Sequence, residues 1–147
     1  MTGVMSGDAI YHRHNTNTNR NEKGDQRMQE EQSSVLARNL LEVFNERDEA
    51  QRLQVIQELY TTNATFFEAD GSFTGAEAIN KRVTEVLQTI PAEAIFRTSG
   101  PMTRNHNAAR LAWTLATEHG PVMASGMDVA FLEGDRIATL YLFIDLP

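Results

Sequence analysis

The chain has 147 residues, a length that corresponds to one domain rather than two. Asp and Glu number 20 against 13 Lys and Arg, which gives a formal net charge of -7 at pH 7. Because such a surface repels phosphate backbones, we expect no nucleic acid partner. The chain contains no Cys, which excludes disulfides, thiolate nucleophiles and cysteine-ligated metal centres.

Apolar runs are short along the whole chain. None approaches the roughly 18 residues needed to cross a bilayer, and residues 1–20 contain no apolar segment that could act as an export signal. We therefore expect a cytoplasmic protein with no membrane partner.

Residues 1–32 are predicted to form a disordered tail. Val4 and Ile10 are their only strongly apolar aliphatic residues, so the segment buries too little surface to offset its ordering entropy. Two nearby histidines in the tail lack the further ligands of a tight metal site, and we predict neither a metal nor a cofactor. Met28 stands just before the first helical pattern, so translation could also begin there.

Three helices are predicted at the start of the domain, which spans 33–147. Ser33 and Ser34 can cap the first helix, Asp48 with Gln51 begins the second, and Pro91 stops the third. Each helix has one apolar stripe at helical spacing. The stripes are Leu36, Leu40, Val43 and Phe44, then Leu53, Ile56 and Leu59, then Ile79, Val83, Val86, Leu87 and Ile90.

The remaining segments are predicted to be strands. A small hairpin is expected between the second and third helices, with its turn at Asp70-Gly71, and everything after Pro91 has the pattern of strands. Three helices followed by a long, strongly twisted antiparallel sheet predict an α+β cone with the helices packed on the concave face of the sheet.

Two turns set the register of the last three strands. A two-residue turn at Gly134-Asp135 pairs Glu133 with Arg136, and a three-residue turn at 119–121 then gives one uniformly apolar face. A two- or four-residue turn there would shift the preceding strand by one residue and mix the faces. The predicted inner face carries Leu111, Trp113, Leu115, Ser125, Met127, Val129, Phe131, Leu140, Leu142 and Ile144. The predicted outer face carries Ala112, Thr114, Ala116, Ala124, Gly126, Asp128, Ala130, Thr139, Tyr141 and Phe143, with Asp128 ion-paired diagonally to Arg110.

The order of these elements resembles the nuclear transport factor 2-like superfamily, in its SnoaL-like (polyketide cyclase-like) branch. The phrases that carry the resemblance are LYTTNATF at 59–66, GAEAI at 75–79, SGMDV at 125–129 and GDRI at 134–137. They are specific for the fold and weak for function, because the superfamily includes isomerases, dehydratases, cyclases, epoxide hydrolases and non-catalytic association domains.

The resemblance implies that the interior of the cone is a ligand pocket, although the same side chains could fill it as ordinary core. The predicted pocket residues are Trp113, Leu115, Ser125, Met127, Val129, Leu140 and Leu142. An almost wholly apolar lining of this kind suits a small hydrophobic molecule.

Resemblance to the ketosteroid isomerases places Glu68 at the position of the general base, although a carboxylate at a strand end could equally point to water. Tyr60, at the end of the second helix, could donate a phenolic hydrogen bond into the pocket. The positions that match the isomerase's oxyanion Tyr and Asp are Leu40 and Met127, so steroid isomerase chemistry is not expected.

The sequence therefore predicts a domain that binds small hydrophobic molecules, without an assured catalytic set. The alternative is an isomerase, dehydratase or cyclase that acts on a polyketide- or terpenoid-like substrate, with Glu68 as base. The outer face, which carries Tyr141 and Phe143 on a floor of small residues, predicts a homodimer.

Overall fold

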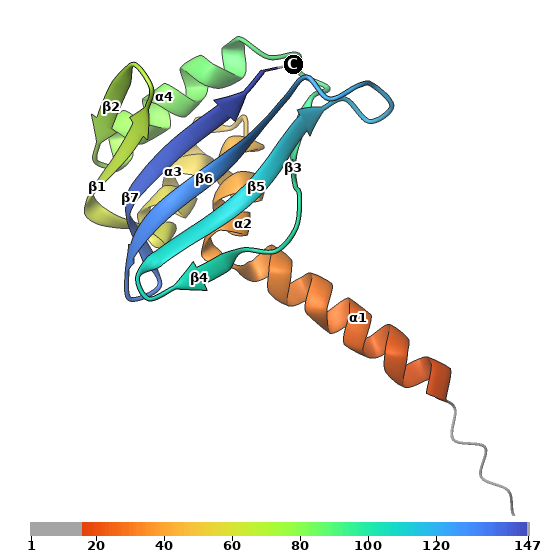
Figure 1. Ribbon diagram of the computed structural model, residues 1–147. Helices are drawn as coiled ribbons and strands as arrows, with labels where there is room; N and C mark the ends of the chain where they lie inside the picture. Colours follow the sequence, from red (N-terminus) through yellow and green to blue (C-terminus); the bar gives the residue numbers. More distant parts are fainter. Residues whose placement is uncertain (1–15, 147) are drawn as a thin grey trace, which may run out of the picture.

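The computed structural model of the protein describes residues 16–146 (Figure 1). The helices are α1 (Thr16–Ser33), α2 (Val35–Arg38), the π-helix η1 (Asn39–Phe44), α3 (Glu49–Leu59) and α4 (Ala76–Gln88). The strands are β1 (Tyr60–Glu68), β2 (Gly71–Thr74), β3 (Ile95–Thr98), β4 (Thr103–Asn105), β5 (Ala108–Ala116), β6 (Ala124–Glu133) and β7 (Arg136–Asp145).

The strands form one curved, unclosed sheet in the order β2-β1-β7-β6-β5-β3, and β4 pairs with the same edge of β5 as β3 does. Helices α2 to α4 cover one face of the sheet, and the other face is turned toward the viewer in Figure 1. This arrangement confirms the predicted α+β class with helices on one sheet face. The sheet is mixed rather than wholly antiparallel, because β1 and β7 run parallel.

The helix starts agree with the capping signals in the sequence. The Ser34 hydroxyl accepts a hydrogen bond from the Ala37 N–H at 3.3 Å, and the Asp48 carboxylate accepts one from the Gln51 N–H at 2.9 Å. The first predicted helix consists of α2 continued by the π-helix η1, in which Asn39 is buried together with Leu40, Val43 and Phe44. A π-helical turn changes which side chains face the sheet, so it brings a polar residue into the core.

Arg52 ties α3 to α4. Its side chain is fully buried, with a relative exposure of 0%. Its Nε donates to the Asn80 side-chain oxygen at 2.6 Å, Nη1 donates to the Glu46 carbonyl at 2.7 Å, and Nη2 donates to the Asn80 carbonyl at 3.2 Å and to the Thr84 hydroxyl. Burial lowers the pKa of Arg52 from its usual value, and the nearby carboxylates of Glu49, Glu46 and Asp48 oppose this effect.

The predicted pairing of β6 is wrong by one residue with both of its neighbours, β5 and β7. The Gly134-Asp135 turn does pair Glu133 with Arg136, but a β-bulge at Ala138 then places Ala130, rather than Val129, opposite Leu140. The connection from β5 to β6 is also longer than the predicted three-residue turn, so Trp113 pairs with Gly126 instead of Met127. Because side chains alternate along a strand, this shift exchanges the two faces of β6.

The inner face of β6 therefore carries Ala124, Gly126, Asp128, Ala130 and Leu132, all of which are buried. Its outer face carries Ser125, Met127, Val129 and Phe131. On the neighbouring strands the predicted faces are correct: Leu111, Trp113 and Leu115 on β5 and Leu140 on β7 are buried inside, and Tyr141 and Phe143 lie outside.

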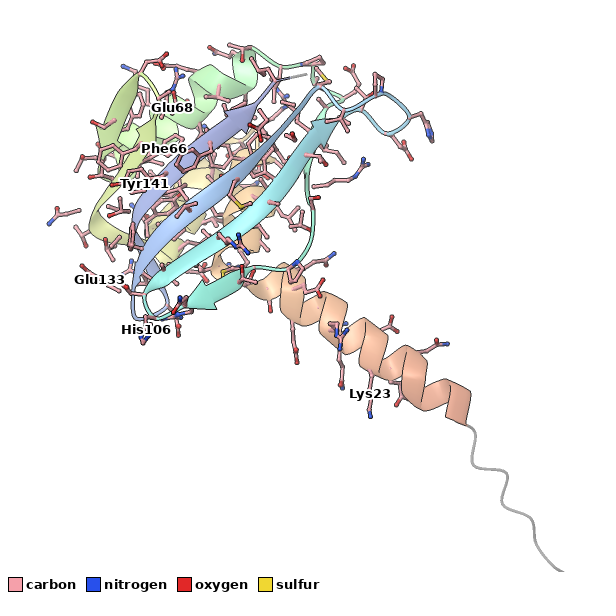
Figure 2. The ribbon with its side chains drawn as sticks, in the orientation of Figure 1. Lys23, Phe66, Glu68, His106, Glu133 and Tyr141 are labelled. Carbon is pink, nitrogen blue, oxygen red and sulfur yellow. The ribbon has the colours of Figure 1, made fainter. Side chains whose placement is uncertain are left out.

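Helix α1 extends away from the domain (Figure 1). From Asn21 to Ser33 nearly all its described side chains are exposed, and Lys23 stands clear of the domain in Figure 2. Residues 1–15 of the expected tail, with its two histidines, lie outside the described residues. Disorder of residues 1–32 stays a prediction.

Candidate functional site

A small cavity lies inside the cone, between the helices and the sheet. Its volume is about 50 Å³, and its lining is apolar apart from one carboxyl group, that of Asp128. Val86, Leu142 and Ile144 are the least buried of the lining side chains and mark the entrance. The lining residues are Leu40, Phe44, Val86, Phe96, Trp113, Asp128, Leu142 and Ile144.

Asp128 is a buried acid in this cavity. It is 2% exposed, and its Oδ1 accepts a hydrogen bond from Nε1–H of Trp113 at 3.0 Å. Burial raises the pKa of Asp128 from 3.8 to about 7, and the hydrogen bond from Trp113 opposes this rise. Both the acid and the carboxylate are therefore populated near neutral pH. Among the described residues, no further hydrogen bond reaches this carboxyl group.

Tyr60 and Asn39 form a second buried polar pair. Tyr60 is 2% exposed, and its hydroxyl donates to Oδ1 of Asn39 at 2.5 Å. Burial raises the pKa of Tyr60 well above its ordinary value, and the negative charge of Asp128 adds to this effect. Nδ2 of Asn39 is buried and has no hydrogen-bond partner within the described part of the chain. Because the Tyr60 hydroxyl donates its hydrogen bond to Asn39, it does not donate one into the cavity.

Glu68 lies at the end of β1 and pairs with Arg82 of α4. Both carboxylate oxygens accept hydrogen bonds from the guanidinium, one from Nε at 2.8 Å and the other from Nη2 at 2.8 Å. Figure 2 shows Glu68 at the end of the sheet beside α4. Glu68 is not among the residues that line the cavity, so its predicted role as general base has no geometric support here.

The predicted pocket residues divide into three groups. Trp113 and Leu142 line the cavity, whereas Leu115 and Leu140 are buried on the inner face and belong to the core. Ser125, Met127 and Val129 lie on the outer face, because the bulge and the longer loop shift β6 by one residue.

Sequence reasoning missed the contributions of the helices and of β3 to this cavity, and it missed Asp128. A signal for Asp128 was present in the alternative of a two- or four-residue turn between β5 and β6. That turn would have shifted the pairing by one residue and placed Asp128 on the same face as Trp113. The predicted ion pair between Asp128 and Arg110 is absent, because Asp128 is buried on the inner face whereas Arg110 is exposed; Nε of Arg110 donates to the Thr103 hydroxyl at 3.0 Å.

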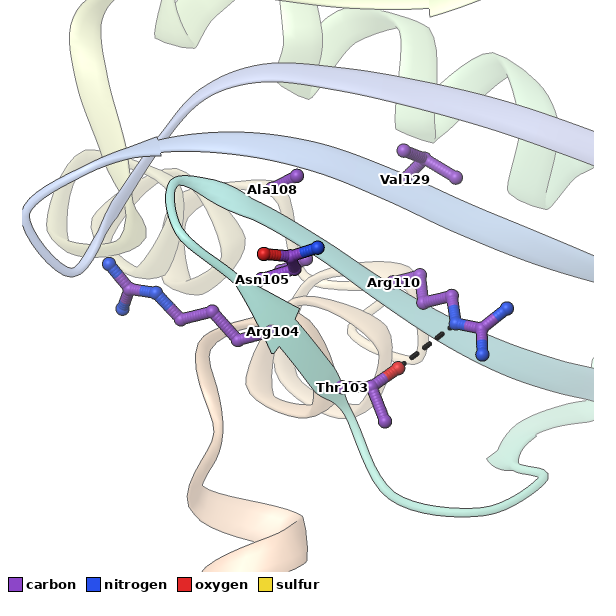
Figure 3. Close-up of a pocket in the computed structure, with 7 residues that line it drawn as sticks. Thr103, Arg104, Asn105, Ala108, Arg110 and Val129 are labelled. Atoms are coloured by element: carbon purple, nitrogen blue, oxygen red, sulfur yellow. Dashed lines mark hydrogen bonds between the residues drawn. The ribbon is translucent and has the colours of Figure 1, made fainter.

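Arg110 lies beside a second hollow, on the outer face of the sheet (Figure 3). This hollow has a volume of about 390 Å³ and is formed by β4, β5 and Val129 of β6. It is open to solvent and contains Arg104, whose guanidinium is already bound to Asp135 and to the carbonyls of Gly134 and His106. Within the described residues, the interior cavity is the one that holds a buried ionisable group in an apolar lining.

No helix within residues 16–146 is both long and apolar enough to span a membrane. No group of three or more His, Asp or Glu side chains in this part of the chain is arranged to hold a metal ion.

Comparison with solved structures identifies the fold. The chain resembles a proposed isomerase of the SnoaL-like family from Agrobacterium tumefaciens str. C58, with a TM-score of 0.68 and 24% identity over 76% of this chain and 95% of that one. A proposed SnoaL-like polyketide cyclase from Jannaschia sp. CCS1 gives 0.62 and 12% identity over 76% and 83% of the two chains. A proposed ketosteroid isomerase from Kribbella flavida DSM 17836 gives 0.57 and 13% identity, with 80% of each chain covered.

These likenesses confirm the predicted nuclear transport factor 2-like fold, which the chain shares with proteins described as SnoaL-like and ketosteroid isomerases. No family model and no curated protein matches the chain.

Proposed function

We propose that the interior of the cone binds a small, largely apolar molecule and that Asp128 transfers a proton to or from it. This reaction class covers isomerases, dehydratases and cyclases that work without a cofactor. The observation that carries the proposal is the single buried carboxyl group in an otherwise apolar cavity. The names of the SnoaL-like and ketosteroid isomerase-like neighbours point to the same class.

The acidity of Asp128 suits this role. A general acid or base works best when its pKa lies near the working pH, and burial places the pKa of Asp128 at about 7. One oxygen is held by Trp113, so the other is free to meet the ligand. A positioned carboxyl group of this kind can catalyse proton transfer next to a carbonyl, or loss of water from a neighbouring carbon.

The size of the cavity limits what can enter it. A water molecule needs about 10–15 Å³ of such space, so a cavity of about 50 Å³ holds a few waters or one small substituent. A polyketide- or terpenoid-like compound would therefore insert only its reacting end, or displace the side chains at the entrance. Ile144, at this entrance, is 53% exposed, so its displacement would break few packing contacts.

A second candidate function is binding without turnover. The observation in its favour is that Asp128 is the one ionisable residue of the lining, whereas acid–base reactions often use two groups. Tyr60, the predicted second group, donates its hydroxyl hydrogen bond to Asn39 instead.

A screen of hydrophobic metabolites by thermal shift, followed by NMR of each hit in D₂O, separates these candidates. The proposal expects isotope exchange or chemical conversion by the wild type, and its loss by at least 100-fold in Asp128→Asn. Conversion that survives in Asp128→Asn but is lost in Glu68→Gln would instead support Glu68 as the base. Hits that bind to both the wild type and Asp128→Asn and are never converted would support binding without turnover.

We also propose that the protein is a cytoplasmic homodimer that associates through the outer sheet face. Phe131, Tyr141 and Phe143 are 41%, 36% and 57% exposed there, and Phe67 stacks on Tyr141 at 4.8 Å between ring centroids. The corrected register adds Met127 and Val129 to this face, which makes it more apolar than the sequence predicted. A contiguous aromatic patch of this kind suits a two-fold contact between copies.

A further inference from the structure

Trp113 reaches Asp128 along a diagonal across two strands. In the register of β5 and β6, Trp113 is paired with Gly126, and Leu111 is the residue directly opposite Asp128. Gly126 and Asp128 are two residues apart and share the inner face of β6. The indole therefore has to lie across Gly126 for its N–H to meet the Asp128 carboxyl.

Gly126 leaves the space that this path requires. A Cβ atom at this position would lie 2.7 Å from Cε2 of Trp113 and would meet Cζ2 and the Phe143 carbonyl oxygen more closely still. Cε2 is bonded to Nε1, so the edge of the indole that rests on Gly126 is the edge that carries the donor. The backbone of Gly126 is not in the left-handed region, so this glycine is needed for space rather than for its conformation.

The other side of the indole is also fixed. The Phe96 ring contacts Trp113 edge to face, with centroids 5.3 Å apart and an interplanar angle of 76°. Phe96 in turn packs edge to face on Phe44 at 5.9 Å. With an exposed fraction of 3%, Trp113 is held in one orientation from both sides.

We infer that Trp113 is a positioning residue for Asp128: its indole N–H holds Oδ1 so that Oδ2 faces the ligand, and Gly126 provides the space for this contact. The inference rests on the proposed role of Asp128. It adds the element that orients the carboxyl group and stabilises the carboxylate form.

After burial, which raises the pKa of Asp128, this hydrogen bond is the next largest influence on its charge. The elements packed around the cavity contribute Leu40 and Phe44 from η1, Val86 from α4, and Leu142 and Ile144 from β7, none of which is charged. Tyr60 is the titratable neighbour whose own pKa responds to Asp128, and its hydroxyl is directed to Asn39.

The test reads the titration of Asp128 without any substrate, by NMR of the Asp side-chain carboxyl carbons. In the wild type the midpoint is expected near pH 7. Trp113→Phe keeps an aromatic ring but removes the donor, and a lost hydrogen bond to a charged group raises the midpoint by about one to two pH units. The matched control is Leu115→Ala on the same face of β5, which lowers stability but leaves the midpoint unchanged.

The wild type offers a second readout, because Trp113 is the only Trp of the chain. Its single indole N–H resonance is expected to shift with pH with the same midpoint as Asp128, and to lose this shift in Asp128→Asn. Gly126→Ala should move the same resonance if the variant folds.

A midpoint in Trp113→Phe within about 0.3 pH units of the wild-type value would overturn the inference. So would an indole resonance that does not respond to the titration of Asp128. Either result is independent of whether any compound is converted, so failure of the proposed function is distinguishable from failure of this inference.

Discussion

The burial of Asp128 makes a specific prediction about stability. The folded protein binds the Asp128 proton more tightly than the unfolded chain does, because burial raises the pKa from 3.8 to about 7. Between these two values the native state carries more protons than the unfolded state, so stability falls as pH rises. Below about pH 4 and above about pH 7 this contribution is constant.

The size of the effect follows from the two pKa values. The difference between 3.8 and about 7 corresponds to roughly 4 kcal/mol, at about 1.4 kcal/mol per pKa unit. This is an upper bound, because any water that enters the cavity would solvate part of the charge. About two of the three pKa units lie between pH 5 and pH 8.5, so the free energy of unfolding should fall by roughly 2.5 kcal/mol over that interval. For a domain with a stability of about 5–15 kcal/mol this is a large share.

Asp128→Asn removes the ionisation and keeps the shape of the side chain and an acceptor for Trp113. We expect the stability gained by the variant over the wild type to be larger at pH 8.5 than at pH 5 by roughly 2.5 kcal/mol. Urea unfolding followed by far-UV circular dichroism at both pH values measures this difference. Asp70→Asn, at an exposed turn, is the control, and no such gain is expected from it.

A variant that is equally destabilised at both pH values would refute the reasoning. That result would mean that the Asp128 carboxylate is already well solvated in the folded state, and that it gives no advantage as a proton-transfer group near neutral pH.

Two further predictions concern packing and assembly. Arg52→Leu should destabilise the fold by roughly 3 kcal/mol in urea unfolding, because it leaves the buried acceptors of Asn80 and Glu46 unpaired. The control is Arg47→Leu, which removes more exposed contacts and should cost less than about 1 kcal/mol. Phe143→Asp should dissociate the homodimer, as measured by light scattering, whereas Leu142→Asp, on the opposite face of β7, should unfold the domain. A wild type that is monomeric at tens of micromolar would contradict the proposed dimer.

The helices of the domain (α2 with η1, α3 and α4) and the buried face of β5 could be predicted from the sequence, because their signals are local. Ser34 and Asp48 cap helices at the expected positions. On β5 the large apolar residues Leu111, Trp113 and Leu115 recur at every second position, so the buried face of this strand follows from the pattern. The Gly134-Asp135 turn likewise depends on two adjacent residues, of which Gly134 has a φ of 61°.

Strand β6 could not be oriented in this way. Apart from Glu133 at its end, Asp128 is its only charged residue, and its larger side chains, such as Met127 and Phe131, are among those that lie outside. Hydrophobic alternation then favours the wrong face, and an Asp in the core contradicts the general rule that charged residues lie outside. The bulge at Ala138 leaves no mark in the hydrophobic pattern.

The bulge also matters for how proteins of this fold are compared with one another. A one-residue bulge changes the pairing register between a strand and its neighbour partway along the strand. A sequence alignment without a gap at the bulge therefore matches interior positions of one protein with exterior positions of another. In this chain Met127 lies on the outer face of β6 and Asp128 faces the interior, so neighbouring residues of this strand have opposite surroundings. Functional positions on β6 are therefore best transferred between such proteins by superposing the strand pairs on the far side of the bulge, before any residue identities are compared.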